Sequence, residues 1–134
     1  MKHFKILSIV LALFAITFTS CSTGSSPGDV IVKSYDLIKA EKYEAVSKLY
    51  VKKGGEKLSK DEAKKVEGLF GMAASEMEKK DGYKSITINN EEISEDGNSA
   101  HVEYTIEYKN GDKDEQDSQL LKVDGNWFIL FSMN

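Results

Sequence analysis

The order of apolar and polar positions divides the chain into an apolar leader, a helical part and a strand part. Residues 6–18 form an almost unbroken apolar run. From Ser26 to Gly82 apolar residues recur every three or four positions, the period of an amphipathic helix. After Gly82 the period falls to two, which is typical of half-buried strands. The pattern therefore predicts helices first and strands afterwards.

Three helices are expected in the first of these parts. Ser26-Pro27-Gly28-Asp29 is a capping sequence, and Ile31, Tyr35 and Ile38 then share one helical face. A short second helix is expected over residues 42–50, before the chain breaks at Gly54-Gly55.

A second capping box, Ser59-Lys60-Asp61-Glu62, opens the third and longest helix. Lys79 and Lys80 suit its last turn, and Gly82 is expected as its C-terminal cap. The apolar stripe of this helix is predicted to consist of Val66, Leu69, Phe70, Ala73 and Met77.

Four strands are expected in the second part. The first contains Ile86 and Ile88, and the last two cover residues 116–123 and 127–131. The second strand should bury one face, formed by Ala100, Val102, Tyr104, Ile106 and Tyr108.

Two dipeptides, Asn110-Gly111 and Asp124-Gly125, are expected as hairpin turns of type I′, in which both central residues have positive φ. Asp96-Gly97-Asn98 marks a further turn. The predicted fold is therefore α+β, with three N-terminal helices packed on a curved four-stranded antiparallel sheet.

The order and spacing of these elements resemble a family of small bacterial lipoproteins, some of them labelled lumazine-binding. This family belongs to the nuclear-transport-factor-2-like (cystatin-like) superfamily. The resemblance covers residues 26–132 and rests on Ser26-Pro27, Val102-Glu103-Tyr104, residues 108–111 and residues 123–127. It implies a curved sheet wrapped around helices, often with a conical pocket. Some relatives are isomerases or hydratases and others are interaction modules, and no catalytic motif transfers to this chain.

The first twenty residues are predicted to be a lipoprotein signal peptide. As a helix the apolar run would be about 20 Å long, short of the ~30 Å hydrocarbon core of a membrane. Phe18-Thr19-Ser20-Cys21 resembles a lipobox, although Phe18 stands where leucine is usual. We expect cleavage between Ser20 and Cys21 and lipidation of the Cys21 thiol, whereas simple secretion and an uncleaved anchor are the alternatives.

The predicted organisation is then a signal peptide over 1–20, the lipidated cysteine and a tether over 21–26, and one α+β domain over 27–134. Several acyl chains, such as palmitate, would make attachment permanent, because each buried methylene contributes ~0.8 kcal/mol. No acidic cluster follows Cys21. The expected location is therefore the cell envelope, on the periplasmic side of the outer membrane if the cell has two membranes.

Charge and composition remove several classes of function. The formal net charge of −4 becomes −6 once Lys2 and Lys5 leave with the signal peptide, so nucleic acid is not an expected partner. The chain has no arginine, which excludes bidentate arginine–phosphate recognition. After residue 20 it has one histidine, His101, and one cysteine. No histidine-rich zinc site, Cys–His pair, metal or cofactor is therefore expected.

The charged segment 112–117 lacks the glycine and the final glutamate of a calcium loop, so we interpret it as a hairpin end entering an edge strand. Aromatic residues are the remaining candidates for a site. Tyr104 and Trp127 are predicted to line any pocket, although core packing explains them without a ligand and is the favoured interpretation. We therefore expect a membrane-anchored, non-enzymatic module that binds a small apolar ligand or an envelope protein. The alternative is an isomerase of the ketosteroid type, which needs a carboxylate beside Tyr104.

Overall fold

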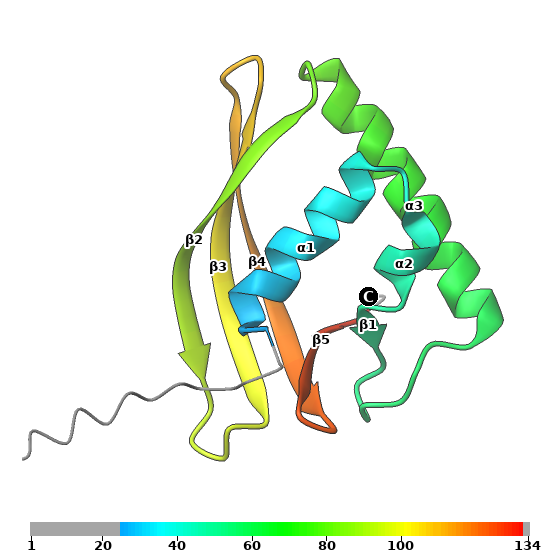
Figure 1. Ribbon diagram of the computed structural model, residues 1–134, viewed down its shortest axis with the longest axis vertical. Helices are drawn as coiled ribbons and strands as arrows, with labels where there is room; N and C mark the ends of the chain where they lie inside the picture. Colours follow the sequence, from blue (N-terminus) through cyan, green and yellow to red (C-terminus); the bar gives the residue numbers. More distant parts are fainter. Residues whose placement is uncertain (1–24, 133–134) are drawn as a thin grey trace, which may run out of the picture.

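The computed structural model describes residues 25–132, which form three helices and a five-stranded sheet (Figure 1). The signal peptide, Cys21 and most of the tether lie outside the described residues. No helix within the described range is long and apolar enough to cross a membrane. The elements in chain order are α1 (Pro27–Lys39), α2 (Tyr43–Ser47), β1 (Tyr50–Val51), α3 (Lys60–Lys79), β2 (Tyr83–Ile93), β3 (Ser99–Tyr108), β4 (Lys113–Val123) and β5 (Asn126–Leu130).

Both predicted capping boxes are confirmed. The Ser26 hydroxyl accepts a hydrogen bond from the Asp29 amide at 3.2 Å, and the Ser59 hydroxyl accepts one from the Glu62 amide at 3.2 Å. In each case the acidic side chain accepts in return from the serine amide, so donors that a helix start leaves unpaired are satisfied. Gly82, at φ 93°, donates its amide to the Met77 carbonyl at 2.9 Å and ends α3 as expected.

The sheet has the strand order β1-β5-β4-β3-β2. Its four long strands form the predicted antiparallel meander, but the prediction of a purely antiparallel four-stranded sheet is wrong. A fifth strand, β1, pairs parallel to β5, with Tyr50 opposite Ile129 and Val51 opposite Leu130. The second helix therefore ends at Ser47 rather than at residue 50, because the backbone beyond it pairs with the last strand: the Leu49 carbonyl accepts from the Ile129 amide at 2.8 Å.

Strand β3 lies near the middle of the sheet and follows the predicted alternation. The five residues assigned to its inner face are all buried, with Val102 fully enclosed. The turn at Asp124-Gly125 has positive φ at both positions (51° and 80°), as type I′ requires. At Asn110-Gly111 only the glycine has positive φ, so the type I′ prediction is wrong for that turn.

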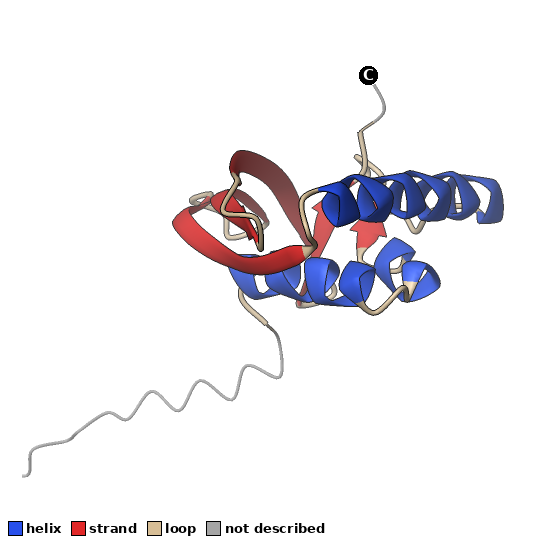
Figure 2. Cartoon of the chain, turned by 90° about the horizontal axis from the view of Figure 1, so that it is seen from above, coloured by secondary structure: helices blue, strands red, loops and turns tan. Residues whose placement is uncertain are grey.

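Helix α1 lies against the curved sheet, where it contacts β2, β3 and β5, and α3 runs at an angle to α1 (Figure 1 and Figure 2). Helix α3 packs mainly on α2 and α1, so only a narrow side of it is enclosed. Val66 and Met77 are buried and Phe70 is half-buried, but Leu69 of the predicted stripe is 52% exposed. The predicted stripe is too wide because spacing alone does not reveal that α3 packs mainly on other helices and only locally, through Phe70, on the sheet.

Candidate functional site

Tyrosine side chains fill the space between α1 and the sheet. The Tyr35 hydroxyl lies 3.4 Å from the Tyr104 hydroxyl, which lies 3.3 Å from the Ser118 hydroxyl. The ring of Tyr35 meets that of Tyr104 edge-on, with centroids 5.9 Å apart, and lies 6.1 Å from that of Tyr83.

Burial raises the pKa of several of these hydroxyls. It is the main cause for Tyr35, whose pKa rises further because the Tyr104 hydroxyl is so close. Burial also dominates for Tyr83, whose hydroxyl lies 3.5 Å from the Asp36 carboxylate, and it raises the pKa of Tyr50. The pKa of Tyr108 is raised to about 12, first by burial and then by Asp114. At neutral pH all four hydroxyls stay protonated and are able to donate a hydrogen bond.

Alkaline solution is therefore expected to destabilise the fold. A tyrosine in the unfolded chain ionises near pH 10, whereas Tyr108 keeps its proton up to about pH 12. Stability is full below about pH 10 and is lost as the pH rises through the folded pKa values, because only the unfolded state releases these protons. The urea midpoint should fall from pH 9 upward. The double variant Tyr35→Phe/Tyr83→Phe should lose less over the same range, and an equal loss would contradict this account.

Trp127 and Tyr104, the residues predicted to line a pocket, are both buried, with exposed fractions of 9% and 5%. Lys122 lies over the Trp127 ring, with its ammonium 5.6 Å from the ring centroid. Tyr104 also borders a shallow depression of about 360 Å³, lined mainly by polar side chains of β3 and β4. The hydrogen-bond partners of its hydroxyl among residues 25–132 are hydroxyls rather than a carboxylate.

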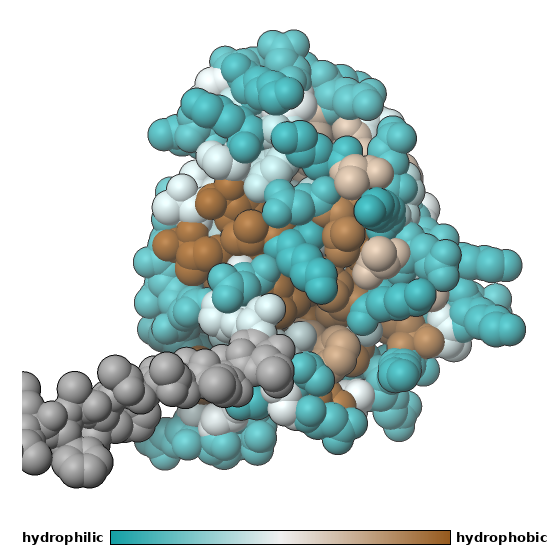
Figure 3. Space-filling view, in the orientation of Figure 1, coloured by the Kyte–Doolittle hydropathy of each residue, from teal (hydrophilic) through white to brown (hydrophobic). Residues whose placement is uncertain are grey.

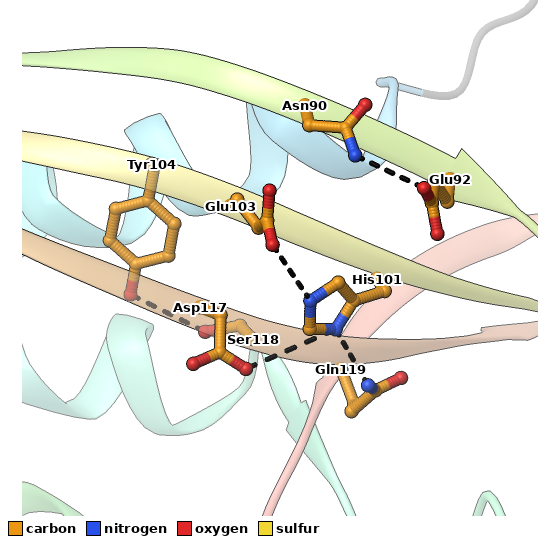
Figure 4. Close-up of polar contacts among 8 residues, drawn as sticks. All are labelled: Asn90, Glu92, His101, Glu103, Tyr104, Asp117, Ser118 and Gln119. Carbon is orange, nitrogen blue, oxygen red and sulfur yellow. Dashed lines mark hydrogen bonds and ion pairs between the residues drawn. The ribbon is translucent and has the colours of Figure 1, made fainter.

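His101 lies on the outer face of β3, the face that the alternation assigned to solvent. Figure 4 shows it between side chains from β3 and β4: its Nδ1 lies 2.7 Å from the Gln119 amide nitrogen. The carboxylates of Glu103 and Asp117 lie at 3.8 and 3.9 Å from its ring nitrogens. Within the described residues no group of three or more His, Cys, Asp or Glu side chains could hold a metal ion.

A groove of about 590 Å³ lies away from the cluster of Tyr35, Tyr83 and Tyr104, between α2, β1, the 52–59 loop and the first half of α3. We call it the α2–α3 groove. The volume of the α2–α3 groove is within the ~300–1,000 Å³ range of small-molecule sites. We call the apolar residues of its lining the floor of the groove; they are Tyr50, Val51, Leu58, Ala63 and Phe128. In the orientation of Figure 1, apolar side chains reach the surface over β2 and near α1 and α2, among hydrophilic neighbours (Figure 3).

Helix α3 presents one face to this groove. Lys60, Ala63, Lys64 and Glu67 all line it and follow the three-and-four spacing of a single helical face. Val66 lies on the adjoining side and is buried against the rest of the protein. The capping box at Ser59 determines where this helix begins and, as a consequence, the positions of Lys60 and Lys64 at the groove.

Opposite α3, the strand β1 carries Tyr50 and Val51 into the lining. The Tyr50 ring packs on that of Phe70, with centroids 5.4 Å apart. No hydrogen bond involves the Tyr50 hydroxyl within the part of the chain that the structure describes, so this protonated group remains a donor. Sequence reasoning missed this site because its lining depends on the unpredicted strand β1. The spacing of Lys57, Lys60 and Lys64 was the one available signal.

The fold has a close structural counterpart. A Campylobacter jejuni protein named as a candidate NTF2-like transpeptidase matches it with a TM-score of 0.67 and 20% sequence identity, over 81% of this chain and 100% of that chain. The fold is NTF2-like. The NTF2-like architecture was thus correctly expected from the order of the elements, although at this identity no residue role transfers.

A second, more distant likeness is to the Streptomyces protein Aln2, with a TM-score of 0.45 and 15% identity over 79% of this chain and 88% of that one. No family model and no curated protein sequence matches the chain. The site must therefore be interpreted from its own geometry on the NTF2-like frame.

Proposed function

We propose that this protein is a lipid-anchored, non-enzymatic module that binds a small ligand in the α2–α3 groove. The observation that carries the proposal is the groove itself, about 590 Å³ in volume and lined on its floor by apolar side chains. Cys21, ahead of the described domain, would hold the module at the membrane. An NTF2-like fold hosts both binding modules and enzymes, so the fold is compatible with this function without requiring it.

Two further observations favour binding over proton-transfer catalysis. The Tyr104 hydroxyl is bonded to other hydroxyls, whereas the isomerase alternative needs a carboxylate beside it. The tyrosine–carboxylate contacts of Tyr83 with Asp36 and of Tyr108 with Asp114 both lie outside the α2–α3 groove. The competing idea of a protein-docking surface has less support, because the large exposed apolar side chains in the described range, Leu69, Met72 and Ile93, are divided between α3 and β2.

Filling the groove should abolish binding of a neutral apolar probe. Ala63 lies on the groove face of α3 and is only partly exposed, so Ala63→Trp places an indole where a ligand would lie. Wild-type protein should enhance the fluorescence of N-phenyl-1-naphthylamine, and Ala63→Trp should weaken its binding at least about tenfold, a loss of ~1.4 kcal/mol.

The matched control is Ser75→Trp, on the same helix but outside the groove and exposed to solvent. It should bind the naphthylamine as the wild type does. If the wild-type protein does not enhance the fluorescence of the probe, or if both tryptophan variants bind the probe equally, the groove is not a ligand site.

A further inference from the structure

We propose that the ligand of the α2–α3 groove is an amphipathic anion, with an apolar chain on the floor and one carboxylate or phosphate at the edge. This inference rests on the proposed function and adds the chemical class of the ligand. It follows from the distribution of charge around the groove and from which of these charges already have partners.

The edge of the groove carries three lysines without a counter-charge. Lys57, Lys60 and Lys64 are exposed, and none of them forms an ion pair with another residue in the range 25–132. We call these three residues the lysine rim. Their ammonium groups are point charges that suit a single compact anionic head.

The acidic side chains nearby do not neutralise the lysine rim. Glu44 lines the groove but is matched by Lys48 at 3.4 Å. Glu62 accepts from the Ser59 amide at 2.8 Å, lies 3.1 Å from Lys52 and does not line the groove. The pKa of Glu62 is lowered, first by the Ser59 amide and then by Lys52, so it stays charged and engaged. Glu67 is the one acid of the lining left without such a partner in the described structure.

The lining therefore holds four lysines and two glutamates in a protein whose formal net charge is −4. A cationic ligand would meet repulsion here, and a neutral one would leave the lysine rim without a partner. The apolar floor in turn excludes a small hydrated anion as the whole ligand, because the side chains of Val51 and Phe128 have no hydrogen-bond donor to replace its water. An anion with an apolar chain satisfies both parts of the lining.

Competition against bound N-phenyl-1-naphthylamine tests this, with decanoate, decyl phosphate and decanol as competitors of equal chain length. Either anion should displace the probe at concentrations roughly tenfold lower than decanol, because three solvent-exposed charges each add a modest attraction to an anionic head group. The advantage should shrink as salt is added. Preference for decanoate would indicate a fatty acid as the source of the ligand, and preference for decyl phosphate a phospholipid.

The triple variant Lys57→Gln/Lys60→Gln/Lys64→Gln should lose the preference for anions while competition by decanol stays unchanged. Its control, Lys33→Gln/Lys65→Gln/Lys113→Gln, removes three exposed lysines outside the groove and should keep the preference. If the wild type binds the probe but decanoate, decyl phosphate and decanol compete equally, the inference of an anionic ligand is overturned and the proposed function is not. A preference that survives in the first triple variant also overturns it, whereas absence of probe binding overturns the proposed function as well.

Discussion

Replacing Cys21 by alanine is expected to move the protein from the membrane fraction to the soluble fraction. The thiol of Cys21 is the atom that would carry the diacylglycerol, and no other cysteine in the chain could replace it. Intact mass of the membrane-extracted protein is the direct measurement. The wild type should give the mass of residues 21–134 plus acyl groups.

The control for this prediction is Ser22→Ala, which changes the neighbouring residue and keeps the thiol. It should remain in the membrane fraction with the same acyl mass. A wild-type mass without acyl groups, or one that begins at a different residue, would refute lipidation at Cys21. The protein would then be a secreted or differently anchored binding module, and the groove proposal would still stand.

Leu120→Ala is expected to give the largest loss of stability among single core substitutions in the sheet. Leu120 is fully enclosed and lies opposite both Ala100 and Ile129, so its removal leaves a cavity between three strands. Such truncations cost about 3 kcal/mol, a large part of the ~5–15 kcal/mol typical of a small domain. With a urea dependence of about 1.5 kcal/mol per molar, the unfolding midpoint should fall by roughly 2 M.

Leu121→Ala is the matched control, because the next residue of the same strand points to the other face and is only half-buried. We expect less than half the shift for it. Equal midpoints for the two variants would contradict the alternation of β4, and with it the placement of the helices on a single face of the sheet.

Local signals in the sequence were sufficient for the two capped helix starts and for strand β3. Ser26 and Ser59 each have an acidic residue three positions on, and hydrogen bonding of this kind is decided within one turn. The alternation from Ala100 to Tyr108 is long enough to determine which face is buried. These features depend on neighbours in the chain, and the structure confirms them.

Features that depend on distant partners could not be predicted in this way. Strand β1 has two residues, too few for any period, and it exists because Tyr50 and Val51 meet a strand almost eighty positions later. Leu69 is apolar and correctly spaced, yet the fold leaves 52% of it exposed. The α2–α3 groove inherits the same difficulty, since Phe128 reaches its lining only through the pairing of β5 with β1.

The parallel pairing of β1 with β5 also determines when, during synthesis, the binding site can exist. A ribosome releases the helices and the hairpins of β2, β3 and β4 before β5 has been made, and earlier segments generally fold first. Strand β1 can pair only after β5 has been made. This pairing joins residues that are far apart in the sequence, and contacts of this kind form slowly. A nascent chain that ends before β5 lacks both Phe128 of the groove lining and the strand that pairs with β1, so the whole ligand site exists only once β5 has been made.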